Sequence, residues 1–161
     1  MPRIELQNFR QFINEKIDFS TDPERNVTLI IGENGTGKTT FAQAFFWCLY
    51  GETDFTDKIM LNRVLAEQMT PDQKTTVKVV LRLTHGSATY EIVRTQEYKK
   101  SYSNKVTGAN TVLNIAVKSA DNNTRYLKQL ECEAEIKKIL PKELSNYFFF
   151  DGERIEKMSK E

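Results

Sequence analysis

The stretch at residues 32–40, G-E-N-G-T-G-K-T-T, limits what this chain can fold into more than any other part of it. It fits the pattern G-x-x-x-x-G-K-(S/T) at Gly32, Gly37, Lys38 and Thr39. Such a loop lies between a buried strand and the first turn of a helix, where its N–H groups converge on a phosphate. An apolar run at residues 26–31 precedes it and an apolar segment at residues 38–50 follows it. The sequence therefore predicts an α/β fold of the P-loop type.

The residue types of this phosphate loop suit a nucleoside triphosphate. Gly32, Gly35 and Gly37 let the backbone turn tightly and approach a ligand without a Cβ in the way. The helix that begins near Lys38 adds the positive end of its dipole, and Lys38 adds a full charge for the β- and γ-phosphates. The Thr39 hydroxyl is the expected ligand of magnesium, which prefers a few protein oxygens together with phosphates and water. We expect the ligand to be ATP with Mg²⁺.

Strand-like and helix-like patterns alternate along the rest of the chain. Strands are expected at residues 3–9, 15–19 and 26–31, and the last reads as buried on both faces because it is almost wholly apolar. An antiparallel meander is expected from strands at residues 76–84, 89–95 and 111–118. Helices are expected at residues 38–50, 59–68 and 127–140, with a short turn or helix at 142–146. We expect an exposed loop at residues 98–110 and, overall, a mixed sheet with a buried helix after the phosphate loop.

Composition argues against several classes of function. The formal net charge is +1, from 23 basic and 22 acidic side chains, so overall charge gives no support for a nucleic-acid or membrane surface. Cys48 and Cys132 make neither a metal-ligand spacing nor a disulfide framework, and the single histidine, His85, offers no histidine-based catalysis. The sequence has no signal peptide and no apolar run of about 18 residues. We therefore expect a soluble, cytoplasmic protein.

The phosphate loop alone does not identify the reaction, because it recognises phosphates and not the acceptor. A GTPase normally carries an N-K-x-D motif that recognises its base. Residues 104–107 read N-K-V-T, with Thr107 where the aspartate belongs. The phosphate loop by itself also fits a small-molecule kinase.

Segments on both sides of the loop are more informative. L-Q-N-F-R-Q-F at residues 6–12, I-I-G-E-N-G-T-G-K-T-T at 30–40 and W-C-L-Y-G at 47–51 together resemble the SMC-like ABC-type ATPases. Within that superfamily the resemblance is to the SbcC, RecF and RecN group. The segment Y-F-F-F-D-G-E at residues 147–153, preceded by I-L-P at 139–141, resembles the DndD ATPases. That family is linked to DNA phosphorothioate modification and restriction.

The resemblance implies roles for the residues that match the motifs of these ATPases. The implied nucleotide-binding residues are Arg10, Asn34, Gly35, Thr36, Gly37, Lys38, Thr39 and Thr40. Lys38 would also act in catalysis, whereas the alternative for Arg10 is an ordinary surface arginine after a strand. The implied fold is a half-domain, the N-terminal lobe of an ABC/SMC-type ATPase head, over residues 1–153. Residues 154–161 would then begin a helix that leads into a coiled coil.

Asp151 stands where most SMC-like heads carry a glutamine that senses magnesium and the attacking water. A carboxylate at this position could still reach the metal, directly or through water. Alternatively, Asp151 closes an apolar run as the metal-binding acid of a Walker B strand does, with Glu153 as the base that activates water. Both interpretations make Asp151 catalytic and, with Thr39, a magnesium ligand. A third makes it only the cap of the last helix.

The implied activity needs parts that the sequence does not contain. It has neither an L-S-G-G-like signature loop nor the sustained heptads of a coiled coil. We therefore expect the N-terminal part of a longer protein that binds ATP and hydrolyses it only in a composite dimeric site. The expected partners are the C-terminal half of the same head, a second head that dimerises on ATP, and DNA with DNA-modification or repair proteins, but no membrane. The alternative is a self-contained small P-loop protein, kinase-like or regulatory, with Asp151 as its Walker B acid.

Overall fold

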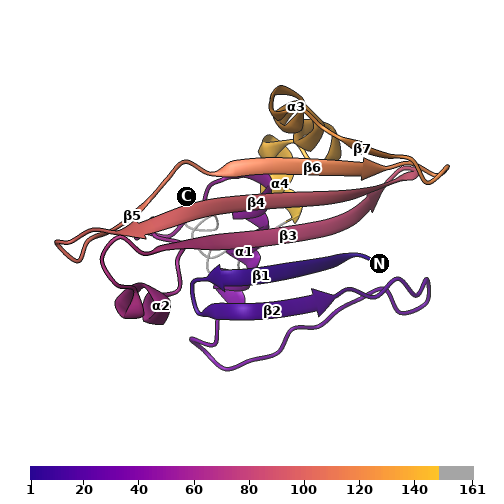
Figure 1. The fold of residues 1–161 in the computed structure, drawn as a ribbon. Coiled ribbons are helices and arrows are strands. Elements are labelled where there is room, and N and C mark those ends of the chain that lie inside the picture. The colour runs from indigo at the N-terminus through magenta and orange to yellow at the C-terminus, as the bar shows by residue number, and fades with distance from the viewer. Residues whose placement is uncertain (149–161) are drawn as a thin grey trace.

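Stretches of alternating apolar and polar residues join into one antiparallel sheet, shown in Figure 1. The computed structural model describes residues 1–148. The strands within them are β1 Arg3–Phe9, β2 Phe12–Asp18, β3 Lys74–His85, β4 Ala88–Lys100, β5 Val106–Gly108, β6 Val112–Lys118 and β7 Thr124–Tyr126. Their order is β2-β1-β3-β4-β6-β7, and β5 pairs with the end of β4. Every strand pair in this part of the chain is antiparallel.

The apolar side chains gather on one face of the sheet, because alternate positions of a strand point the same way. A row of such residues crosses four neighbouring strands: Ile4, Leu81, Ile92 and Ile115. Each of them is at most 5% exposed. The opposite face carries ion pairs, such as that of Arg82 Nε with Glu91 at 2.6 Å. The sheet therefore has one apolar face that other elements must cover.

Helix α1, Lys38–Tyr50, packs on this apolar face, behind the sheet in Figure 1. Ala44, Trp47 and Cys48 are at most 2% exposed, and the Trp47 ring lies 5.5 Å from that of Phe9 in β1. The helix ends at Gly51, whose φ of 74° is left-handed and whose N–H donates to the Trp47 carbonyl. The expected bounds and burial of this helix are confirmed.

The other helices are α2 Arg63–Gln68, α3 Gln129–Ile139 and α4 Lys142–Phe148. Cys132 and Ile136 of α3 are buried in the same apolar core. α2 lies at the end of β3 and β4 where β5 is, and α3 with α4 lies at β6 (Figure 1). In the part of the chain that the structure describes, every helix is too short or too polar to cross a membrane.

The strand expected at residues 26–31 is wrong. Val27, Leu29 and Ile31 are 82%, 78% and 83% exposed, in the connection between β2 and α1. The expected mixed sheet is also wrong, since every pair of described strands is antiparallel and none of these strands pairs with residues 26–31. A strand buried on both faces needs neighbours on both sides. Without them in residues 1–148, this apolar run is left facing solvent.

The loop expected at residues 98–110 is wrong in part, because β4 continues to Lys100 and pairs with β5. Tyr98 is 1% exposed, and its hydroxyl accepts a hydrogen bond from the Met60 N–H at 2.8 Å. This buried contact fastens the end of β4 to the chain before α2. It explains why β4 extends beyond residue 95, where the expected strand ends.

Other differences concern where elements begin. α2 begins at Arg63 instead of residue 59, because the Asn62 side chain accepts a hydrogen bond from the Leu65 N–H and caps the helix there. β2 begins at Phe12 instead of residue 15. The β3–β4 hairpin, strand β6, helix α3 and the short helix α4 are confirmed.

Candidate functional site

The phosphate loop at residues 32–40 adopts a conformation that only glycine tolerates at several positions. Gly35 and Gly37 have φ values of +83° and +107°, in the left-handed region. A Cβ on Gly32 would lie 2.5 Å from the Thr36 hydroxyl oxygen. Gly37 is the N-cap of α1 and offers no side-chain cap, so the first-turn N–H groups of the helix face outward. Such an N-terminus is a ready anion site.

The side chain of Lys38 lies across this loop. Its ammonium donates to the carbonyl oxygens of Gly32 at 2.6 Å and Glu33 at 2.7 Å. The Thr36 hydroxyl donates to the same Glu33 carbonyl at 2.8 Å. The ammonium is therefore held over the concave side of the loop by neutral acceptors, which phosphate oxygens outcompete because they carry charge.

Most of the other predicted residues of the loop are accessible to a ligand. Asn34, Thr36, Lys38 and Thr39 are exposed and Thr40 is half-buried. The Thr39 hydroxyl can hold a magnesium ion only together with phosphates and water, which matches what this ion prefers. In residues 1–148, no group of three acidic, histidine or cysteine side chains is placed to hold a metal. Asp151, the other predicted ligand, lies outside the described residues.

The turn between β1 and β2 packs directly against the loop. A Cβ on Gly37 would lie 2.1 Å from Gln11 Nε2 and 3.0 Å from Phe12 Cζ. Gln11 matches no functional motif by itself, although it stands beside Arg10 in the segment at residues 6–12. The close approach of Gln11 to a glycine of the loop depends on the fold and leaves no local pattern.

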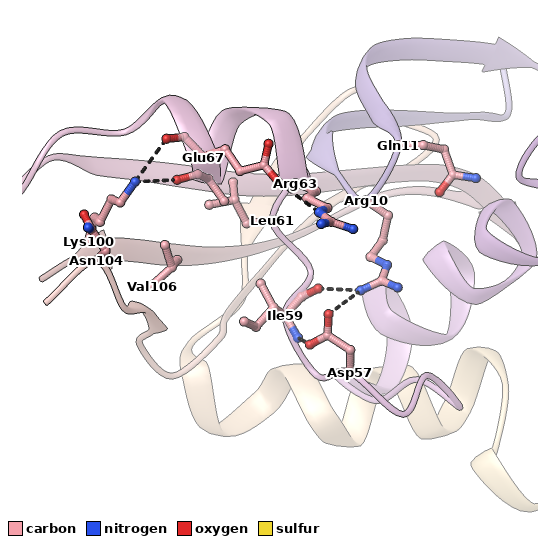
Figure 2. A pocket seen from close by; sticks show the side chains of 11 residues that line it. Arg10, Gln11, Asp57, Ile59, Leu61, Arg63, Glu67, Lys100, Asn104 and Val106 are labelled. Atoms are coloured by element: carbon pink, nitrogen blue, oxygen red, sulfur yellow. Dashed lines mark hydrogen bonds and ion pairs between the residues drawn. The ribbon is translucent and has the colours of Figure 1, made fainter.

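Arg10 is held on the chain before α2, as Figure 2 shows. Its Nη1 donates to the Ile59 carbonyl at 2.8 Å and to Asp57 Oδ2 at 3.3 Å. Its guanidinium carbon lies 4.6 Å from the centre of the Phe55 ring, a cation–π distance. The left-handed φ of 52° at Arg10 turns the chain into this contact. The structure thus places Gln11, and not the Arg10 guanidinium, against the phosphate loop.

A cavity of about 590 Å³ opens on the Arg10 side of this turn (Figure 2). Arg10, Gln11, Asp57 and Ile59 line one part of it. Lys100 lines the other part; this buried side chain donates to the carbonyls of Ala66 and Glu67 at the end of α2. Because Gln11 lines the cavity and also contacts Gly37, the cavity and the phosphate loop are neighbours. The volume is that of a typical small-molecule site.

The wall of this cavity is fixed by buried contacts. The Tyr98 hydroxyl accepts from the Met60 N–H and donates to Gln96 Oε1 at 2.7 Å. Burial raises the pKa of Tyr98, so this hydroxyl keeps its proton at neutral pH. The segment that carries Asp57 and Ile59 is thereby fastened to the sheet.

Comparison with known proteins agrees with the geometry of the loop. The profile of a family described as "AAA domain" matches residues 3–161. The SbcC component of the SbcCD nuclease from Staphylococcus saprophyticus is 38% identical over 56 residues, which cover 35% of this chain and 6% of that protein. The DNA double-strand break repair Rad50 ATPase of Methanocaldococcus jannaschii is 27% identical over 145 residues, covering 81% of this chain and 13% of that protein.

The DNA replication and repair protein RecF of Acetivibrio thermocellus is 41% identical over 56 residues, covering 35% of this chain and 14% of that protein. The chain therefore spans between 6% and 14% of the length of these relatives. The similarity supports the resemblance to the SbcC and RecF group, and DndD is not among the three.

Proposed function

The chain belongs to the AAA domain family, and we propose that it is the N-terminal lobe of an SMC-like ATPase with its ATP site at residues 32–40. The loop itself carries this proposal. Left-handed glycines lead into an N-terminus of α1 that no side chain caps, and Lys38 lies across it. Helix N–H groups without a capping side chain, next to a lysine ammonium, suit the charge of a triphosphate. The similarity to SbcC, Rad50 and RecF favours this class over a GTPase or a small-molecule kinase.

The nucleotide would lie with its phosphates on the loop and its nucleoside beyond Gln11, in the cavity beside Arg10. In this arrangement the Lys38 ammonium exchanges the carbonyls of Gly32 and Glu33 for phosphate oxygens. Mg²⁺ would be held by the Thr39 hydroxyl and by phosphates and water, and it would neutralise charge that develops on the phosphates. Asp151 remains the proposed second protein ligand.

The exposed apolar run at residues 26–31 supports the proposal that a partner covers it. Burying a Val, Leu or Ile side chain is worth roughly 1.5–3 kcal/mol, so covering Val27, Leu29 and Ile31 would contribute about 6 kcal/mol. We infer that the C-terminal half of the same head supplies strands beside this run. The relatives support this, since each is far longer than the stretch that matches.

Hydrolysis would follow only when the C-terminal half and a second head complete the site. Phosphoryl transfer depends on positioning and on stabilising charge, so a lobe with only part of the charged groups binds ATP with little turnover. The proposed role is DNA repair, modification or restriction. The names of the Rad50 and RecF relatives support repair, and the resemblance of residues 147–153 to the DndD ATPases supports modification.

A binding measurement on the full 161-residue chain tests the ATP site. In Lys38→Ala, MgATP should bind at least about tenfold more weakly by titration calorimetry, because a charge-assisted contact to phosphate is lost. Lys118→Ala removes the same charge from an exposed position at the end of β6 and should leave the affinity within about twofold. Equal affinity of the Lys38→Ala variant and the unchanged chain would refute the site.

A further inference from the structure

Strand β4 carries a buried cation that the proposed ATP site does not use. Arg94 is 7% exposed, and it donates to the carbonyls of Cys48 at 3.0 Å and Leu49 at 3.1 Å and to the Thr111 hydroxyl at 3.0 Å. It closes the C-terminal end of α1, at the opposite end of the helix from the phosphate loop. Burial lowers the pKa of Arg94, because the guanidinium loses water.

No acid pairs with this charge in the described part of the chain. The hydrogen-bond acceptors of Arg94 there are all neutral, and no carboxylate forms an ion pair with it. Glu133 raises the pKa of Arg94 through its charge, without a hydrogen bond or an ion pair to it. This effect is smaller than the lowering by burial. A buried charge without a counter-ion is costly to the folded state. A ligand that brings a negative charge would remove part of that cost.

A cavity of about 320 Å³ lies against this guanidinium, between the end of α1, strand β6 and helix α3. Leu49, Leu113 and Ile136 give it apolar walls. Lys137 adds positive charge at its exposed rim, whereas the ammonium of Lys142, which also lines it, is paired with Glu52 at 2.6 Å. Among the described residues that line it, Glu133 is the only acid. The cavity thus combines one buried cation with an apolar wall and a polar rim.

The bonding of Arg94 leaves capacity for one more partner. A guanidinium has five N–H donors, and three of them have acceptors in the protein. Two N–H groups of one guanidinium match the two oxygens of a carboxylate. We propose that this cavity binds a small organic carboxylate, with its charged group on Arg94 and its apolar body against Leu113 and Ile136.

Benzoate is a suitable probe, and benzamide is its neutral counterpart of the same shape. In a titration of the full chain followed by NMR, benzoate at millimolar concentration should shift the amides of Gly51 and Thr111 in a saturable way. Benzamide at the same concentrations should leave them unchanged. Equal shifts with benzamide, or equally strong shifts with inorganic phosphate, would overturn the assignment to an organic carboxylate.

Two neighbouring lysines of α3 provide matched variants. Lys137→Glu, at the rim of the cavity, should weaken benzoate about fivefold. Lys138→Glu makes the same change of charge one residue further, outside the lining, and should leave the affinity within about twofold. This variant also breaks the ion pair of Lys138 with Glu135 at 2.9 Å, so the melting temperatures of both variants are measured alongside. Both side chains are exposed, so neither change should unfold the chain. Equal affinities of these two variants would contradict the proposed site.

Arg94→Lys keeps the positive charge but loses the pair of N–H groups that matches a carboxylate. It should weaken the binding of benzoate more than about tenfold. Because Arg94 also closes α1, the melting temperature of this variant must be measured alongside. If the variant does not fold, the comparison of Lys137→Glu with Lys138→Glu decides. The proposal does not depend on ATP binding, so either site can fail while the other stands.

Discussion

Gly37 shows how tightly single residues of the phosphate loop are constrained. Its φ of +107° is unfavourable for any residue with a Cβ, and Gln11 and Phe12 occupy the space that a Cβ would take. Gly35, with φ of +83°, has the same kind of backbone but nothing within 4 Å of an added Cβ. Substitutions at the two positions therefore distinguish the free-energy cost of a left-handed backbone from the cost of a steric contact.

A pair of alanine substitutions tests this difference. Gly35→Ala should lower the free energy of unfolding by about 1 kcal/mol, from the left-handed backbone alone. Gly37→Ala should lower it by about 2 kcal/mol, because Phe12 Cζ would lie 3.0 Å from the new Cβ, whereas the exposed amide of Gln11 can swing away. Urea unfolding measures both, and Gly86→Ala, at a hairpin turn with φ of +60° and open space, is the control for Gly35→Ala. Equal losses at positions 35 and 37 would mean that the turn between β1 and β2 does not press on the loop.

The residues of the phosphate loop could be predicted from the local sequence, but the contacts of the residues around the loop could not. The glycines and Lys38 were identified because their spacing is a local property. Arg10 was identified from its motif, yet its contacts with Asp57 and Ile59 join positions 47 and 49 residues apart in the chain. Gln11 and the buried Arg94 have their roles only through the packing of β1, β4 and α1. No local pattern marks them.

Among the elements, the apolar run at residues 26–31 is the one whose structure depends most on its neighbours. Helix α1 and the β3–β4 hairpin were predicted correctly because each carries its own pattern, an apolar helix or an alternating strand. The run at 26–31 has the composition of a central strand, and such a strand forms only between others. The described residues contain no strands beside it, so the composition predicted an element that the isolated lobe does not form.

Leucine substitutions in this run and in the sheet distinguish the two environments. Leu29→Ala should change the free energy of unfolding of the isolated chain by less than about 0.5 kcal/mol, since Leu29 is 78% exposed. Leu81→Ala, at a position 5% exposed in β3, should cost about 2–5 kcal/mol. Urea unfolding measures both. A large loss for Leu29→Ala in the isolated chain would show that the run is already packed and would count against a covering partner.

At the scale of the whole molecule, α1 connects the two sites that the structure suggests. The phosphate loop lies at its N-terminus and the Arg94 cavity at its C-terminus. At the C-terminal end of α1, the Tyr50 hydroxyl donates to the Leu140 carbonyl at 3.1 Å, and Glu52, just beyond the helix, pairs with Lys142 at 2.6 Å. The helix is thus fastened to the sheet along its length and to the α3–α4 connection at its far end.

In the proposed function the chain is a nucleotide-binding half whose chemistry needs a second half. The most direct test is the steady-state rate of ATP hydrolysis by the 161-residue chain, alone and after addition of the C-terminal half. We predict negligible turnover alone, turnover once the C-terminal half is present, and loss of that turnover in Lys38→Ala. Robust hydrolysis by the chain alone, abolished by Lys38→Ala, would contradict the account and establish a self-contained P-loop enzyme.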